Sequence, residues 1–260
     1  MRRSRTMARI RNKEVVRMCC VGHFIPAFIK HASVAGYDCI WLDMEHRCFD
    51  DRQIQALLAY CHLFDIDCMV RPPTRERARL YRYLEDGAAG LMIPHVSTPE
   101  EAQQLVEAVK FPPIGNRGLD GAGLDSNFLH DPVDEYVDFA NRETFLVVQI
   151  ETPEAIEHVD EIAGTPGVDG LFIGPGDLGL RLRRENRSAD MDDCVRCVSE
   201  AAERHRKVWG LPVSSRQQME RFAENGAQLL NRAGEFFALM QTLNEGIKDY
   251  ENLPVGGAHA

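Results

Sequence analysis

Short apolar runs alternate with longer segments of helical periodicity along the whole chain. The run at 144–150 is almost continuously apolar, which is typical of a strand buried on both faces of a parallel sheet. The remaining runs are of the same kind. Together they predict strands at residues 15–21, 37–42, 68–70, 89–94, 144–150, 168–173, 207–213 and 227–230.

The segments between these runs carry the caps and spacing of helices. Thr98-Pro99-Glu100 and Thr152-Pro153-Glu154 each offer an N-cap threonine, a proline at the first helical position and an acid in the first turn. Glycines close several segments, among them Gly36 and Gly87. The pattern predicts helices at 26–35, 51–64, 75–86, from 98 onward, 133–141, from 152 to just before 164, 191–206, 215–225 and 235–250.

This alternation predicts a parallel sheet, and eight strand–helix units predict its closure into a (β/α)₈ TIM barrel. The helix at 133–141 is an extra one that precedes the fifth strand. The length of 260 residues is close to the roughly 250 of such barrels, so we expect one domain over residues 1–260. The long loop at 111–132, rich in Gly, Pro, Asn and Asp, is a candidate functional loop.

Composition narrows the class of protein. The chain is 44% apolar and 27% charged, and its net charge of −10 argues against nucleic acid or an anionic membrane as the main partner. No apolar run approaches the roughly 18 residues that cross a bilayer, and the basic start lacks the apolar segment of an export signal. We therefore expect a cytoplasmic protein.

The eight cysteines fall mostly in predicted strands and helices, where cysteine acts as a small hydrophobic residue. Cys194 and Cys197 have no second pair that would complete a zinc site.

Polar residues gather where the predicted strands end. Because the carboxyl ends of barrel strands lie on one rim, where such folds build their sites, we expect these residues to converge. They are Asp43, Glu45, His46, Arg71, His95, Glu151, Asp177, Ser214, Asn231 and Arg232.

Two acids of this rim follow neighbouring strands. Glu151 ends the fifth predicted strand, and Asp177 lies just past the sixth, in Gly174-Pro175-Gly176-Asp177. Carboxylate oxygens suit a divalent ion such as Mg²⁺ or Mn²⁺, with positions left for water and substrate. The alternative is that Glu151 is only a helix-start acid and Asp177 only a turn acid.

Arg71 and His46 complete a hypothesis about the chemistry. A 2-oxo acid can chelate a divalent ion, which then stabilises the enolate formed when a carbon–carbon bond breaks. Arg71 adds a positive group near the keto oxygen, and His46 is the candidate base, because histidine titrates near neutrality. The alternatives are that Arg71 is only a surface salt-bridge residue and that His46 has only a structural role. His95 is a second candidate base.

Several motifs resemble those of the HpcH/HpaI aldolases. They are Asp43-Met44-Glu45-His46, Val70-Arg71-Pro72, Gly90-Leu91-Met92-Ile93-Pro94 with Glu100-Glu101-Ala102, Phe111-Pro112-Pro113-Ile114-Gly115-Asn116-Arg117-Gly118, Gln149-Ile150-Glu151-Thr152 and Phe172-Ile173-Gly174-Pro175-Gly176-Asp177-Leu178. The resemblance extends over about residues 15–240, in the order and spacing of the family. It implies a (β/α)₈ barrel and a class II pyruvate aldolase, which uses Mg²⁺, Mn²⁺ or Co²⁺ to cleave a 4-hydroxy-2-oxo acid to pyruvate and an aldehyde through a metal-stabilised enolate.

The resemblance also implies a role for each matching residue. Glu151 and Asp177 match the metal ligands, Arg71 the enolate-stabilising arginine and His46 the base. Glu45 matches a residue that holds the metal waters, and Gln149 one near the metal. The backbone N–H groups of Gly176 and Asp177 match those that hold the substrate carboxylate. Glu85 matches an acid that supports the base from a neighbouring subunit.

Two segments depart from the family pattern, and both lie where the aldehyde half of the substrate would bind. Strand eight ends in Asn231-Arg232-Ala233-Gly234-Glu235, and the loop after Arg117 reads GLDGAGLDSNF. The related alternatives are an oxaloacetate-type decarboxylase, a malyl- or citramalyl-CoA lyase, and a ligand-binding barrel without turnover. All four of Glu151, Asp177, Arg71 and His46 are present, which favours the aldolase.

The last predicted helix carries an apolar face, formed by Phe236, Leu239, Met240, Leu243 and Ile247 at helical spacing. This face either covers its own barrel or packs on a neighbouring subunit. The resemblance implies the second arrangement, in a homotrimer or hexamer.

Overall fold

Eight parallel strands form one closed barrel, in which each strand pairs with its sequence neighbours and β8 returns to β1. The computed structural model describes residues 2–185, 190–251 and 253, so the predicted domain of 1–260 includes positions outside these ranges. The barrel confirms the predicted fold class. The strands are β1 (Val16–Val21), β2 (Cys39–Asp43), β3 (Asp67–Arg71), β4 (Gly90–Ile93), β5 (Phe145–Ile150), β6 (Gly170–Ile173), β7 (Val208–Pro212) and β8 (Leu229–Gly234).

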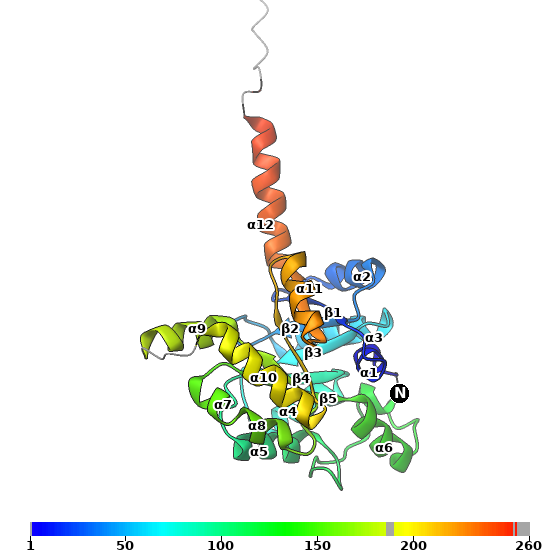
Figure 1. The fold of residues 1–260 in the computed structure, drawn as a ribbon. Coiled ribbons are helices and arrows are strands. Elements are labelled where there is room, and N and C mark those ends of the chain that lie inside the picture. The colour runs from blue at the N-terminus through cyan, green and yellow to red at the C-terminus, as the bar shows by residue number, and fades with distance from the viewer. Residues whose placement is uncertain (1, 186–189, 252, 254–260) are drawn as a thin grey trace, which may run out of the picture.

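Helices surround this barrel (Figure 1). The extra helix before the fifth strand is confirmed as α6, and the predicted helix from 152 is interrupted at His158, where α7 ends and α8 begins. The helices are α1 (Arg5–Arg11), α2 (Pro26–Ala35), α3 (Asp51–Leu63), α4 (Arg77–Glu85), α5 (Pro99–Val109), α6 (Val133–Glu143), α7 (Pro153–Glu157), α8 (Val159–Gly164), α9 (Pro175–Arg184), α10 (Met191–His205), α11 (Arg216–Glu224) and α12 (Glu235–Gly246), with short 3₁₀ turns at Leu124–Ser126 and Ile247–Tyr250.

Two helices, α1 and α9, were not predicted. Helix α1 reads RTMARIR and has too few apolar residues for a clear helical stripe, but Ser4 caps it by accepting a hydrogen bond from the N–H of Met7. Helix α9 contains two glycines, which are poor helix formers, and it begins at Pro175 directly after β6. In both cases tertiary contacts outweigh weak local propensity.

Side chains that alternate along each strand divide the core in two. One set fills the barrel interior, where Trp41 meets Phe172 edge to face with ring centroids 5.5 Å apart. The other set, including Ile40 and Leu42 of the same strand β2, packs outward against the helices. The fully buried β2 therefore reads as a continuous apolar run, as parallel strands do.

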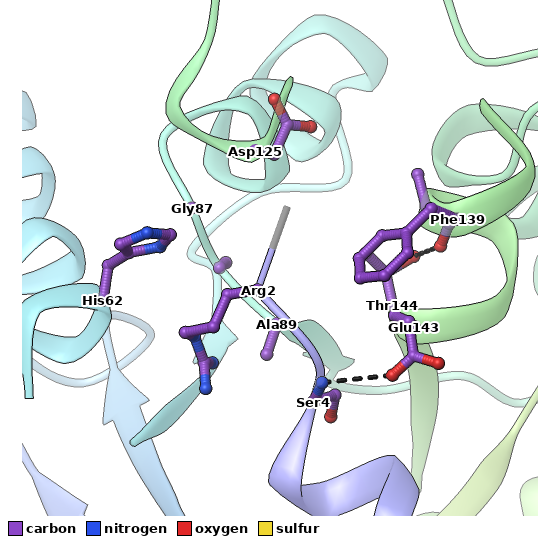
Figure 2. Close-up of a pocket in the computed structure, with 11 residues that line it drawn as sticks. Arg2, Ser4, His62, Gly87, Ala89, Asp125, Phe139, Glu143 and Thr144 are labelled. Atoms are coloured by element: carbon purple, nitrogen blue, oxygen red, sulfur yellow. Dashed lines mark hydrogen bonds between the residues drawn. The ribbon is translucent and has the colours of Figure 1, made fainter. Parts of the chain in front are cut away.

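The N-terminal segment lies across the end of the barrel where the strands begin. The N–H of Ser4 donates to Glu143 of α6 at 3.1 Å, and Figure 2 shows Arg2 and Ser4 among Gly87, Ala89 and Glu143 around a small pocket. The predicted rim lies at the opposite end of the barrel, where the strands finish.

Helix α12 leaves the barrel and stands away from it (Figure 1). Its apolar residues are largely exposed, with Phe237 73% and Leu243 70% accessible. The alternative in which this face covers its own barrel is therefore wrong. Among the helices of the described ranges, none has the length and apolar character needed to cross a membrane.

Candidate functional site

Arg71 lies at the centre of the rim, at the carboxyl end of β3. Its partner in the strand register of β2 is Asp43, and the two side chains pair through two contacts, Nε to Oδ1 at 3.1 Å and Nη2 to Oδ2 at 2.9 Å. The Trp41 ring lies 4.7 Å from the guanidinium carbon. Arg71 is only 6% exposed, so this bidentate pair with ring contact fixes a buried cation in one orientation.

A chain of polar contacts runs from Arg71 to β5. Its Nη1 lies 3.1 Å from Oε2 of Glu45 and donates to Oε1 of Gln149 at 3.4 Å. The amide nitrogen of Gln149 in turn donates to Oε2 of Glu151 at 2.6 Å. The structure therefore brings together four of the residues predicted for the site.

Glu151 is the most deeply buried acid of this set, with 1% exposure. Its Oε1 accepts the backbone N–H of His95 at 2.7 Å and lies 3.0 Å from Nδ1 of the same residue. Burial raises the pKa of the Glu151 carboxyl, and the nearby charges of Glu45 and Asp177 raise this pKa further, while His95 opposes the rise. A cation at this position would relieve the cost of ionising the buried carboxyl.

The surroundings of Glu151 fit a divalent metal. One ligand atom each from Glu45, His95 and Glu151 lies within 4.8 Å of the other two. A Cβ at Gly174 would collide with the Glu151 carboxylate and lie 2.7 Å from the Gln149 amide nitrogen, so glycine leaves room for these groups. The donors are chiefly carboxylate oxygens, the type that Mg²⁺ and Mn²⁺ prefer.

Gly176 and Asp177 occupy the first turn of α9, directly after β6. The first intrahelical bond of this turn runs from the N–H of Leu178 to the carbonyl of Gly174, so the N–H groups of Gly176 and Asp177 precede the regular helical bonds. A Cβ built on Gly176 meets no heavy atom within 4 Å among the described residues. A carboxylate could therefore reach these two amides from the rim.

His46 lies at the edge of the cluster. Its side chain is 54% exposed, and its Nε2 is 3.5 Å from Oε2 of Glu45. The turn that presents it is fixed by Asp43, whose Oδ1 accepts the backbone N–H of Glu45 at 3.1 Å. The histidine is thus placed beside the buried groups and open to a molecule at the rim.

Glu85, which the resemblance assigns to the site, does not lie at the rim of its own chain. It ends α4, which leads into the start of β4, and so it lies towards the other end of the barrel. Burial raises the pKa of this carboxyl, Arg117 opposes the rise, and Asp125 and Asp120 add to it.

The strands that face Arg71 and Glu151 across the barrel contribute a separate set of polar residues. His23, after β1, has its Nδ1 2.9 Å from Oε1 of the buried Glu235, which also accepts the N–H of Gly22 at 2.6 Å. Asn231 is buried on β8, whereas Arg232 lies with Met219 of α11 on the outside of the barrel. The expectation that Arg232 belongs to the rim is therefore wrong, because alternate residues of a strand point to opposite faces.

Sequence reasoning missed two contributions to this site. Trp41 lies inside the barrel beneath Arg71, two positions before the strand end, and Asp43 holds Arg71 as its register neighbour. Pairing the ends of adjacent predicted strands could have found the second contact. The double contact of His95 with Glu151 has no sequence signal, because it depends on the backbone conformation of a loop.

Comparisons with known proteins identify similar sequences and a similar structure among aldolases. A family model described as HpcH/HpaI aldolase/citrate lyase matches residues 17–239. A hydroxypyruvate/pyruvate aldolase of Roseovarius nubinhibens is 33% identical over 230 residues, which cover 87% of this chain and 89% of that protein. Another, from Deinococcus radiodurans, is 42% identical over 57% of this chain, and the match spans 53% of its length, about half. The crystal structure of an HpcH/HpaI aldolase from Desulfitobacterium hafniense superposes with a TM-score of 0.88 at 29% identity, covering 96% of this chain and 98% of that one.

Proposed function

Because this chain belongs to the HpcH/HpaI aldolase/citrate lyase family, we propose that it is a divalent-metal-dependent aldolase. The reaction is the reversible cleavage of a 4-hydroxy-2-oxo acid to a three-carbon 2-oxo acid and an aldehyde. The names of its relatives, hydroxypyruvate/pyruvate aldolases, make pyruvate or hydroxypyruvate the expected three-carbon partner.

The observation that carries this proposal is the continuous contact from Arg71 through Gln149 to Glu151. It joins a buried cation to a buried carboxylate across the rim of the barrel. A 2-oxo acid needs both kinds of group: a positive one facing the keto oxygen, and carboxylates that would hold a metal to which its carboxylate and keto oxygens can bind.

In this proposal Glu151 and Asp177 hold the metal, and Glu45 borders the same space. The metal, when bound, supplies a Lewis acid that accepts the negative charge of the enolate. Arg71 adds a fixed positive charge on the same oxygen, at little cost of reorganisation, because Asp43 and Trp41 already orient it. The first-turn amides of Gly176 and Asp177 bind the substrate carboxylate.

His46 is proposed as the base that takes the proton of the C4 hydroxyl group. Its half-exposed ring beside Glu45 lets it reach a substrate that enters from the rim. Glu85 of a second copy of the chain is proposed to support this histidine, since within one chain Glu85 ends the helix that leads away from the rim.

Metal removal tests the proposal directly. Pyruvate and hydroxypyruvate are each incubated with a panel of aldehydes in the condensation direction, and adducts are detected by NMR. We expect condensation that EDTA abolishes and that Mg²⁺, Mn²⁺ or Co²⁺ restores. The variant Glu151→Gln keeps the shape of the side chain but lacks its charge, so we expect little restoration by any of the three metals.

The matched control is Glu143→Gln, a buried acid at the opposite end of the barrel, which contacts Ser4 and Arg11 rather than the rim. It should show the same metal dependence as the unaltered protein. Full activity in a preparation shown by elemental analysis to be metal-free would exclude the proposed function.

A further inference from the structure

Three nitrogen atoms of His95 lie close to two acids of the rim, Glu151 and Glu45. Its backbone N–H donates to Oε1 of Glu151 at 2.7 Å, and its Nδ1 lies 3.0 Å from the same oxygen. Its Nε2 lies 3.2 Å from Oε1 of Glu45. One residue thus reaches both carboxylates, and the two ring nitrogens face different acids.

The backbone of His95 adopts the left-handed conformation, with φ at 57°. This conformation is unfavourable for a residue with a Cβ, and such strain persists where the surroundings enforce it. Here Arg75 enforces it. The guanidinium of Arg75 donates to the carbonyls of Pro94, at 2.9 Å, and of His95, and it pairs with Glu101 at 2.7 Å.

The strained conformation has a geometric consequence. It lets the N–H and the ring of one residue meet a single oxygen of Glu151, while Gln149 holds the other oxygen at 2.6 Å. Both oxygens of the proposed metal ligand are therefore held in place by the protein itself. Loss of a partner that orients a ligand in this way typically weakens metal binding by about 10–100-fold.

We propose that His95 is a positioning residue of the metal site, which fixes the Glu151 carboxylate through its N–H and Nδ1 and links it to Glu45 through Nε2. The inference rests on the proposed function, since it takes Glu151 as a metal ligand. It assigns His95 to the orientation of the ligand and not to proton transfer.

Three substitutions separate the contacts. In His95→Asn the side-chain amide nitrogen takes the place of Nδ1, so the contact with Glu151 is kept and that with Glu45 is lost. In His95→Gln the amide nitrogen takes the place of Nε2, so of the two side-chain contacts only the one with Glu45 is retained, while the backbone N–H still meets Glu151. His95→Gly removes both side-chain contacts, keeps the backbone N–H and relieves the strain of the left-handed conformation.

The experiment titrates each full-length protein with Mn²⁺ and follows free Mn²⁺ by electron paramagnetic resonance, without substrate. We expect His95→Gly and His95→Gln to bind Mn²⁺ about 10–100-fold more weakly, the range for losing a partner that orients a ligand. His95→Asn should stay close to the unaltered protein. The thermal midpoint of His95→Gly should be unchanged or higher, so weaker binding would not reflect a damaged fold.

Arg206→Gly is the matched control, because Arg206 also has a left-handed backbone, with φ at 56°, and follows α10 as its C-cap, away from the rim. It should bind Mn²⁺ normally. Equal Mn²⁺ affinity in His95→Gly and the unaltered protein would overturn this inference and leave the proposed function standing. No Mn²⁺ binding by the unaltered protein would end both.

Discussion

At the scale of single residues, the buried charges of the rim are paired with one another. The Arg71 guanidinium has partners on three sides, in Asp43, Glu45 and Gln149, and Trp41 lies against it. A buried charge without such partners would destabilise the fold by several kcal/mol. The same contacts that make the cation tolerable also aim it, so stability and the proposed catalysis depend on one set of side chains.

Substitutions at His46 and Arg71 should affect aldol cleavage and oxaloacetate decarboxylation differently. Aldol cleavage needs a base and an electron sink, whereas decarboxylation of oxaloacetate needs only the sink, because its leaving group is already a carboxylate. His46→Ala should therefore lower kcat for aldol cleavage by about 10²–10⁴-fold while largely sparing oxaloacetate decarboxylation. Arg71→Ala should impair both. Steady-state kinetics with the two substrates measures the split.

The control for His46→Ala is His31→Ala, an exposed histidine of α2, which should leave both rates unchanged. If His46→Ala leaves aldol cleavage near the unaltered rate, or reduces both reactions equally with metal still bound, His46 is not the base.

Glu85 should impose a pH dependence on stability. Burial raises the pKa of Glu85 from its ordinary value of 4.5, so the folded chain keeps a proton that the unfolded chain has lost over the window between these two pKa values. The free energy of unfolding therefore falls as pH rises through this window. The buried Glu151 contributes a fall of the same sign, so urea unfolding at several pH values should show a smaller fall in Glu85→Gln than in the unaltered protein.

The exposed Glu203→Gln on α10 serves as its control and should keep the slope of the unaltered protein. Parallel pH profiles for Glu85→Gln and the unaltered protein would show that this carboxyl has no raised pKa.

At the scale of elements, α1 is attached to the barrel by the acids at the start of β3. Asp67 is fully buried, and its Oδ2 accepts the hydroxyl of Ser4 at 2.6 Å and the N–H of Thr6 at 2.7 Å, while Arg2 pairs with Oδ1. The exposed Asp65 also pairs with Arg2, at 3.1 Å, and with Arg5, at 2.8 Å. One helix is thus held by a buried acid and an exposed one.

Asp67 and Asp65 should differ sharply in their contribution to the free energy of unfolding. Asp67→Ala removes the buried partner of Arg2 and the acceptor of two hydrogen bonds, so we expect the free energy of unfolding to fall by about 3–5 kcal/mol. Asp65→Ala, the matched control, should cost about 0–1 kcal/mol, because surface ion pairs contribute little. Urea denaturation measures both losses. Equal losses would contradict the conclusion that the buried Asp67 is the main attachment of α1 to the barrel.

At the scale of the whole molecule, two apolar surfaces lack a partner within the described chain. Helix α12 exposes Phe237 and Leu243 as it leaves the barrel, and Ile247 of the following 3₁₀ turn is exposed as well. Where a barrel helix following β8 would pack, a hollow of about 340 Å³ remains between α2 and α11, lined by Tyr37, Met219 and Leu230 among others. A displaced helix beside a hollow of this kind is the arrangement expected of subunits that exchange the helix.

We therefore predict a homo-oligomer, a trimer or hexamer, in which α12 packs on a neighbouring copy and Glu85 approaches that neighbour's rim. Light scattering at micromolar concentration should give a multiple of the chain mass. Leu243→Asp should shift the protein towards the monomer, because a charge in an apolar contact is costly. Gln241→Asp, a polar residue of the same helix, is the control, and a purely monomeric unaltered protein would exclude this assembly.

The alternation of apolar runs and capped helices was sufficient to predict the barrel, because each element buries a face with its own period. The extra helix α6 and the convergence of Arg71, Glu151 and Asp177 at one end follow from chain order alone. The unpredicted α1 and α9 have weak local propensity and form through their contacts with the barrel, which no local pattern encodes.

The sequence by itself therefore determined the fold class, the end of the barrel that carries the site and the residue types gathered there. Only the tertiary structure decided which partner each charge has. The N–H and ring of His95 meet one oxygen of Glu151 because the loop after β4 adopts a left-handed turn, and Arg232 leaves the rim because of its register in β8. Such facts depend on backbone dihedrals and strand register, which are settled when distant segments pack and not by the order of residues in either segment.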